Sequence, residues 1–267
     1  MEIPKEIRKP KRLSPNVLLL YSTPKAGKTV VCSLLKDHLI LELEAGGADY
    51  ITGRIMEINK PSEFTKTIEL LKNSPDKVCK YLVIDTTTKM DEWSEIVGTY
   101  LYMEKAQGKK FNKETTADGV LVPNGKTFKH TDKEFETVHS IGQGYGYAHS
   151  RQIMTDWYDS LIELITLKKI DNLILISHIK DKYIEKKGEI VESSDINLTG
   201  KVKSIYAARV DAIGFLQRKE GKAYLNFNNE YKVICGGRCH HLNGELLVSE
   251  KMEDGTIKGY WENIYID

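Results

Sequence analysis

The chain has 267 residues, a net charge of +1 and a hydrophobic fraction of 40%. That length suits one large α/β domain, plain or elaborated, and the apolar fraction excludes a disordered chain. A charge so close to zero excludes binding of a polyanion by the whole surface, so only local basic patches could serve. No apolar run is long enough for a membrane span, and the basic segment 1–12 lacks the apolar centre of a signal peptide. We therefore expect a cytoplasmic protein with no membrane partner.

Strands and helices alternate along the first two-thirds of the chain, which predicts a mainly parallel sheet flanked by crossover helices. Short continuous apolar runs, typical of buried parallel strands, occupy residues 17–21, 39–43, 81–84 and 173–177. Helical spacing of apolar residues follows these runs at 29–36, 62–72, 92–103 and 149–168. We expect Ser62 to cap the second of these helices.

The remaining segments predict how the chain is organised. Residues 105–146 are rich in Lys, Thr, Gly and Asn and are too long for an ordinary connection, so they form an inserted element. Residues 180–200 read as a polar connection, and strands at 205–217, 222–228 and 231–235 would add antiparallel members to the sheet. We expect a basic segment at 1–16, a core at 17–238 and a C-terminal strand extension at 239–267.

A phosphate-binding loop is the most specific signal. The sequence STPKAGKT at residues 22–29 matches G-x-x-x-x-G-K-[ST], except that Ser22 replaces the first glycine. It stands between a buried strand and a helix, where backbone N–H groups curl around an anion and the helix N-terminus adds its positive dipole end. Gly27 allows close approach, Lys28 reaches the β- and γ-phosphates, and Thr29 ligates Mg²⁺. The sequence thus predicts ATP and Mg²⁺ as cofactors, with ATP bound by Ser22, Thr23, Pro24, Lys25, Ala26, Gly27, Lys28, Thr29 and Val30.

Two carboxylates follow buried strands at the edge where open α/β sheets bind ligands. Asp85 ends the run YLVID and is expected to hold Mg²⁺, with capping of the next helix as the alternative. Glu44 ends the second strand and is expected to orient the attacking water. Glu42 is the competing candidate, because strand alternation sends it to the same side, but Glu44 lies nearer the strand end.

The order of these motifs, followed by LILIS and His178, resembles the RecA-like recombinase core. Downstream, GKVKSIYAARVD at residues 200–211 is similar to the RecA segment after a DNA-binding loop, where it would form a strand. The compact size, with Ser-His in place of Asn-Gln, looks most like the phage RecA-like ATPases of the Sak single-strand-annealing group. The resemblance covers about 17–238 outside the insertion. It implies an ATPase with an α/β RecA-like P-loop core and antiparallel strands at its C-terminal end.

By that resemblance, His178 is a catalytic sensor that reports the γ-phosphate to residues 179–199, which would contact single-stranded DNA. A local hydrogen bond at the strand end is the alternative for His178. Lysines, one aromatic residue and several acids make this segment a weak stacking and phosphate-binding composition, so DNA as a partner rests on the resemblance. The nucleic-acid-binding candidates are Lys180, Lys182, Tyr183, Lys186 and Lys187.

The resemblance also implies a homo-oligomer, as a ring or a filament, in which a neighbouring subunit donates a cation to the γ-phosphate. Arg238, in the sequence Gly-Gly-Arg, is the first candidate for this catalytic role and Lys232 is the second. A surface arginine in a turn is the alternative for Arg238. A single-strand-binding protein is a further candidate partner. The expected setting is phage recombination, annealing or replication in the cytoplasm of an infected bacterium.

Two other classes of function remain open on the sequence. One is a nucleotide-switched assembly or helicase-loading factor without annealing activity, and the other is a P-loop enzyme acting on a small molecule. A small-molecule kinase would cluster arginines over the phosphates, whereas here they are scattered along the chain, at Arg151, Arg209, Arg218 and Arg238.

A local group of cysteines and histidines could bind zinc, but its spacing fits no common zinc pattern. In a cytosolic protein reduced thiols are the expected state. The group consists of Cys235, Cys239, His240 and His241.

Overall fold

The computed structural model describes residues 7–106, 113–115, 121–123, 128–130, 133–135, 147–186, 189–228 and 233–266. Side chains are described for residues 7–102, 147–180, 194–228 and 233–266. Within these parts of the chain, no helix is long and apolar enough to cross a membrane.

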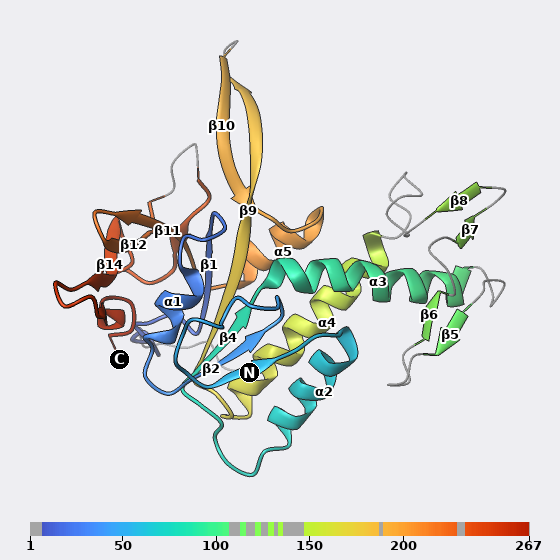
Figure 1. The fold of residues 1–267 in the computed structure, drawn as a ribbon, viewed down its shortest axis with the longest axis horizontal. Helices are drawn as coiled ribbons and strands as arrows, with labels where there is room; N and C mark the ends of the chain where they lie inside the picture. Colours follow the sequence, from blue (N-terminus) through green and yellow to red (C-terminus); the bar gives the residue numbers. More distant parts are fainter. Residues whose placement is uncertain are drawn as a thin grey trace.

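One large sheet runs through the molecule (Figure 1). Six of its strands are parallel and stand in the order β11-β1-β9-β4-β2-β3, so that β9 separates β1 from β4. Every residue of β1, β2 and β4 is buried, as their continuous apolar runs predict. The bounds are β1 (Val17–Ser22), β2 (His38–Glu42), β3 (Ile55–Glu57), β4 (Tyr81–Asp85), β9 (Asn172–Lys186) and β11 (Ala212–Lys219).

Antiparallel strands extend the sheet beyond β11. β12 (Lys222–Asn226) pairs with β11, β14 (Glu245–Lys251) with β12, and β15 (Ile257–Gly259) with β14. A two-residue strand, β13 (Gly236–Gly237), pairs with the beginning of β11. The expected architecture is thereby confirmed: a mainly parallel sheet flanked by helices, with antiparallel strands contributed by the C-terminal end of the chain.

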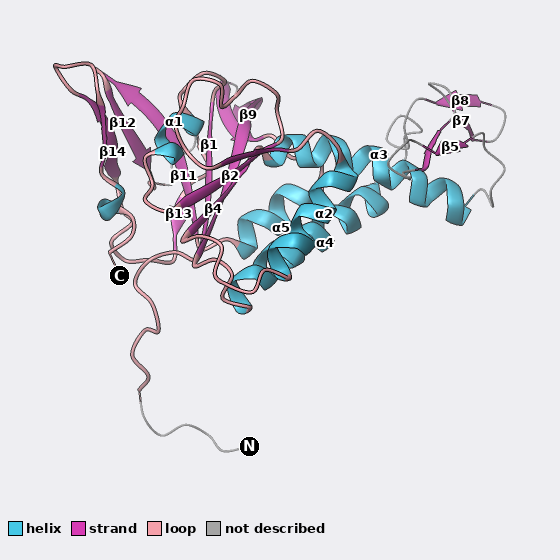
Figure 2. Cartoon of the chain, turned by 60° about the horizontal axis from the view of Figure 1, so that its bottom comes forward, coloured by secondary structure: helices cyan, strands magenta, loops and turns pink. Residues whose placement is uncertain are grey.

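Helices lie on both faces of the sheet (Figure 2). α2 (Pro61–Lys72), α3 (Thr87–Ala106), α4 (Tyr147–Thr166) and α5 (Lys201–Arg209) lie on one face, and α1 (Lys28–Ser33) lies on the other. Alternating residues of β1 serve the two faces: Leu19 joins the core under α2–α5, whereas Leu18 and Leu20 join the core under α1. The 3₁₀ helix η1 (Trp261–Asn263) closes the second core, because the indole N–H of Trp261 donates to the carbonyl of Val31 at 2.9 Å.

The segment after the fourth buried strand differs from the expectation. β9 continues to Lys186 and pairs antiparallel with β10 (Glu189–Ile196), so the polar connection expected at 180–200 is wrong. The two strands form a ribbon that projects from the sheet (Figure 1). Hydrogen bonds between the strands satisfy the backbone, and polar residues suit a ribbon surrounded by water.

A helix replaces the strand expected from residue 205, and with it the strand that the RecA resemblance suggested at 200–211. α5 follows Gly200, which has a φ of 53°, and it buries Val202 and Tyr206. Their spacing of four residues places both on one helical face, a signal that the strand interpretation overlooked. The strand expected at 231–235 is also wrong where the chain is described, since Val233 makes only an isolated bridge with Ser194.

Two helices begin at residues other than those predicted, and the expected insertion contains short strands. α2 begins with Pro61 after Lys60, which makes no side-chain cap, so Ser62 is not the N-cap. α3 begins at Thr87, five residues before the predicted position. Within the expected insertion at 105–146, four short strands pair two by two, as β5 (Lys113–Thr115) with β6 (Leu121–Pro123) and β7 (Phe128–His130) with β8 (Lys133–Phe135).

Candidate nucleotide site

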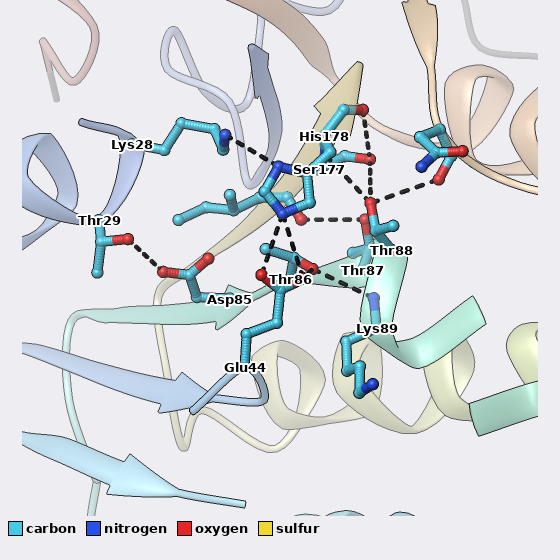
Figure 3. A network of polar contacts seen from close by, with 12 residues as sticks. Lys28, Thr29, Glu44, Asp85, Thr86, Thr87, Thr88, Lys89, Ser177 and His178 are labelled. Carbon is cyan, nitrogen blue, oxygen red and sulfur yellow. Dashed lines mark hydrogen bonds and ion pairs between the residues drawn. The ribbon is translucent and has the colours of Figure 1, made fainter. Parts of the chain in front are cut away.

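Parallel strands end at one edge of the sheet and bring the predicted site residues together (Figure 3). β1 and β9 pair in a register that places Ser22 beside His178. β4 lies on the other side of β9 and ends at Asp85, and β2 lies beside β4 and leads to Glu44. The phosphate loop, both carboxylates and the histidine therefore meet at the carboxyl ends of the parallel strands, where sheets of this kind bind ligands.

The phosphate loop has the backbone that its pattern requires. Gly27 is the N-cap of α1 and has a φ of 86°, in the left-handed region that favours glycine. Ser22, which replaces the first glycine of the pattern, is buried and donates its hydroxyl to the carbonyl of Leu216 on β11 at 2.7 Å. The side chain of Ser22 thus ties the start of the loop to the neighbouring strand.

Lys28 holds its ammonium inside the loop. Nζ donates to the carbonyl of Ser22 at 3.2 Å and to that of Thr23 at 2.9 Å, and it lies 3.3 Å from Nδ1 of His178. Burial lowers the pKa of Lys28, against the opposing effect of the Asp85 carboxylate. A phosphate in the loop would supply the negative charge that a buried ammonium lacks.

Thr29 and Asp85 offer the oxygen ligands of a magnesium ion. Thr29 Oγ1 donates to Asp85 Oδ2 at 2.6 Å (Figure 3). Burial raises the pKa of Asp85, and the hydrogen bond from Thr29 works in the opposite direction. Mg²⁺ takes one or two protein oxygens and completes its octahedron with water and phosphate, which one hydroxyl beside one carboxylate satisfies. Among the described residues, no group of three or more His, Cys, Asp or Glu offers another metal site.

Glu44 and His178 form the other half of the site. His178 Nε2 lies 3.1 and 3.2 Å from the two oxygens of Glu44, and Thr86 Oγ1 donates to Glu44 Oε1 at 2.6 Å. Because an ammonium only donates and a carboxylate only accepts, a neutral imidazole with its proton on Nε2 satisfies both Lys28 and Glu44. The hydrogen bond from His178 lowers the pKa of Glu44, burial opposes this effect, and Thr86 reinforces it.

The structure gives other roles to the competing candidate Glu42 and to the helix cap that was the alternative for Asp85. Glu42 is 4% exposed and accepts the N–H of Ala48 at 2.7 Å, so it braces the loop after β2 instead of joining the site. Helix capping belongs to Thr86, whose Oγ1 accepts the N–H of Lys89 at 3.2 Å. Thr86 therefore contacts both Glu44 and the start of α3, and sequence analysis missed it. The threonine run directly after Asp85 was its only signal.

A pocket of about 470 Å³ lies over these groups. Tyr50 stands at its wall and is 94% exposed, so its ring is free to stack on a nucleotide base. Sequence analysis also missed Tyr50, because a single aromatic residue in a glycine-rich stretch carries no motif. Of the nine residues expected to bind ATP, six line the pocket (Pro24, Lys25, Gly27, Lys28, Thr29 and Val30), whereas Ser22, Thr23 and Ala26 do not.

Arg238 lies at the opposite edge of the sheet. Its guanidinium donates to the carbonyl of Ala208 at 2.6 Å and lies 3.5 Å from Asp211 Oδ1. Asp211 precedes β11, whereas the phosphate loop follows the far end of β1, roughly 17 Å away at 3.3 Å per residue. Arg238 therefore does not reach the nucleotide site of its own chain, and Lys232 lies outside the described residues.

A different arginine lies against the phosphate loop. Arg218, which the sequence grouped with the scattered arginines, donates from Nε to the carbonyl of Ala26 at 2.8 Å. Arg209 is paired with Asp159 on α4, away from the loop. The described arginines therefore place one guanidinium at the loop and do not form the cluster of a kinase lid.

Of the residues predicted to bind nucleic acid, only Lys180 has a described side chain. Lys180 is exposed at the base of the ribbon. The side chains of Lys182, Tyr183 and Lys186, and Lys187 as a whole, lie outside the described residues.

The cysteine and histidine group is not gathered around a common point. Cys235 Sγ donates to the carbonyl of Asn228 at 2.7 Å, and His241 Nε2 lies 2.9 Å from the carbonyl of Ile264. Cys239 forms no disulfide bond within the described chain. The structure thus gives no support to zinc at this group in the described chain.

The fold and the site define a P-loop NTPase. The family model described as an AAA domain matches residues 14–239, most of the chain, and the chain belongs to that family. Proteins of this class generally use ATP and Mg²⁺. No curated protein matches the sequence. Among solved structures, the RadB recombinase aligns with a TM-score of 0.44 and 13% identity over 93% of this chain and 92% of that one, which is too distant to carry an argument about function.

The Glu44–His178 contact predicts how Glu44 titrates. Replacing His178 by Phe removes the largest cause of the lowered pKa, so the pKa of Glu44 should rise. Thr86→Val removes a smaller cause and should produce a smaller rise. Side-chain carboxyl resonances followed by carbon-13 NMR across a pH titration measure both. An equal or larger rise in Thr86→Val would show that the histidine does not dominate.

Proposed function

We propose that this protein hydrolyses ATP at the edge formed by Lys28, Asp85, Glu44 and His178, and that hydrolysis is coupled to single-stranded DNA bound at the base of the β9–β10 ribbon. The observation that carries the proposal is the hydrogen-bonded path that joins the two places. It begins at Glu44 and His178 and passes through α3 to the residues that precede α5.

In the proposed reaction, Lys28 contacts the β- and γ-phosphates within the loop. Thr29 and Asp85 hold Mg²⁺, which neutralises the charge that develops on the phosphate oxygens when it is bound. Glu44 orients the attacking water and accepts its proton, because the hydrogen bonds from His178 and Thr86 keep it ionised. His178, held between Lys28 and Glu44, is placed to respond when a phosphate draws the ammonium away.

Glu44→Gln tests the water-positioning role. The amide keeps the shape and can still accept the proton of Thr86, but it cannot take a proton from water, so turnover should fall about 10²- to 10⁴-fold. Nucleotide affinity should change little, because the phosphate loop is untouched. Steady-state ATPase assays and equilibrium binding of an ATP analogue measure the two quantities.

Glu57→Gln is the matched control, since Glu57 is an exposed carboxylate on the neighbouring strand β3. Turnover in that variant should equal that of the wild type. Turnover in Glu44→Gln within a few-fold of the control would remove Glu44 from the reaction.

The proposed DNA surface is a second pocket, of about 390 Å³, at the start of α5. Three cationic side chains and one half-exposed ring line it: Arg151, Lys180, Lys201 and Tyr147. Cations paired with an aromatic face are what a sequence-tolerant single-strand site uses, through phosphate contacts and base stacking. Three of these residues differ from the candidates that the sequence suggested, because the fold brings α4, β9 and α5 together.

The two pockets are joined by short polar contacts. Thr88 Oγ1 accepts the N–H of His178 at 3.1 Å and lies 3.4 Å from the carbonyl of Asn197, at the end of the ribbon. One helical turn further on, Asp91 accepts the N–H of Thr199 at 2.6 Å. A shift of His178 would therefore reach the backbone on which the second pocket is built.

DNA binding should depend on salt in proportion to the phosphate contacts. In Lys180→Gln/Lys201→Gln, the slope of log affinity against log salt should fall by about 1.4, because each contact to a single strand contributes about 0.7. Fluorescence anisotropy with a labelled oligonucleotide measures the slope, and stimulation of the ATPase by DNA should weaken in parallel.

The control variant removes two exposed lysines elsewhere, Lys66 on α2 and Lys168 after α4, and should keep the wild-type slope. Equal slopes in the two double variants would place the DNA elsewhere. A wild-type ATPase indifferent to DNA would favour the nucleotide-switched assembly factor, and consumption of a small acceptor would favour a small-molecule enzyme.

The proposed setting is recombination, annealing or replication of a phage, in a homo-oligomer that works beside a single-strand-binding protein. Support comes from the sequence resemblance to the Sak group and from the position of Arg238. The side chain of Arg238 is 64% exposed, faces away from its own site and is held by Asp211 and Ala208. A ring or filament could present it to the nucleotide of the next subunit.

Mixing two inactive variants tests the neighbour's role. Lys28→Ala should lose nucleotide binding, and Arg238→Ala should lose roughly a thousand-fold in turnover if it is the arginine finger. Mixed oligomers contain interfaces that pair an intact loop with an intact finger, so ATPase activity should partly return. Normal hydrolysis by Arg238→Ala alone would point to another cation, with Lys232 the next to test.

A further inference from the structure

Arg218 reaches the phosphate loop from the neighbouring strand. β11 runs parallel to β1, with Tyr21 opposite Phe215, and the hydroxyl of Ser22 bonds the carbonyl of Leu216. Arg218 lies two residues further along β11, past the end of β1. From there its Nε donates to the carbonyl of Ala26 at 2.8 Å, within the loop itself.

This contact determines which way one peptide of the loop faces. In a trans peptide the carbonyl and the following N–H point in opposite directions. The carbonyl of Ala26 is held towards Arg218, so the N–H of Gly27 faces away from Arg218. Gly27 lines the nucleotide pocket and Arg218 does not. The N–H of Gly27 is thereby directed to the side where an anion-binding nest needs its donors.

The fit between the two residues is close. A Cβ on Gly27 would lie 2.2 Å from Nη2 of Arg218 and 2.9 Å from its Cζ, so any side chain there would displace the guanidinium. The φ of 86° favours glycine at this position, and the absence of a side chain lets the guanidinium lie directly against Gly27. Arg54 and Arg238 also donate to backbone carbonyls, but each of them pairs with an aspartate as well.

We propose that Arg218 is a positioning residue of the phosphate loop: it anchors the Ala26 carbonyl and so aims the Gly27 N–H at the phosphates. The inference rests on the proposed nucleotide site and adds to it a residue that no motif contains. A donor aimed at a phosphate acts in the ground state and in the transition state alike. Its loss should therefore raise KM and leave kcat nearly unchanged.

The experiment uses the full chain with Arg218→Met, which keeps the apolar stem and removes every donor. Lys219→Met is the matched control, because it removes the same charge one residue further on, where Lys219 pairs with Glu245 at 2.6 Å. Arg218→Met should raise the Kd for ADP and the KM for ATP about ten-fold, with kcat within about two-fold, while the control keeps wild-type values. Arg218→Lys, which retains one donor, should recover most of the affinity.

A second measurement reads the loop without nucleotide. The carbonyl carbon-13 resonance of Ala26 should move in Arg218→Met and stay in place in Lys219→Met, with thermal melting confirming that both variants are folded. An unmoved resonance together with an unchanged Kd would overturn the inference. A fall in kcat at unchanged KM would also overturn it, because Arg218 would then contact the transferred phosphate. If the wild-type chain bound no nucleotide, the proposed function would fail, and the Ala26 resonance alone would still decide the role of Arg218.

Discussion

Parallel pairing of buried strands is the constraint on which the site depends. β1, β9, β4 and β2 point the same way, so each delivers the residue at its carboxyl end to one edge of the sheet. At this edge, burial disfavours the charged forms of Lys28 and Asp85. The hydrogen bond from His178 has the opposite effect on Glu44, because it lowers the pKa of that carboxyl. The buried strands hold Lys28 and Asp85 close together and largely out of water, whereas the Glu44 side chain stays 38% exposed.

Much of this arrangement follows from local sequence. A phosphate loop between an apolar run and a helix, and carboxylates at the ends of apolar runs, place Lys28, Thr29, Glu44 and Asp85 at one edge by topology alone. The strands themselves could be predicted because each is buried on both faces and reads as an unbroken apolar run. β2 ends at Glu42 and not at Glu44 as expected, yet it is Glu44, two residues further on, that contacts His178, while Glu42 accepts the N–H of Ala48.

What the sequence could not show depends on contacts between distant segments. Arg218 meets the loop across 192 residues, and its strand carries no motif. Tyr206 buries its ring beside Tyr158 on α4, so tertiary packing makes a helix where the β-branched and aromatic residues suggest a strand. The sequence beyond His178 is rich in charged and polar residues, and hydrophobic periodicity gives no signal for such strands.

α3 begins at the polar network and ends beside the four short strands β5–β8. Its 20 residues make a rod about 30 Å long whose first turn is attached to Glu44 through Thr86 and to His178 through Thr88. If this rod tilted by about 10° at the network, its far end would move by roughly 5 Å. The hairpins β5–β6 and β7–β8 follow the far end of α3, where a tilt of the helix at the nucleotide site would produce the largest displacement.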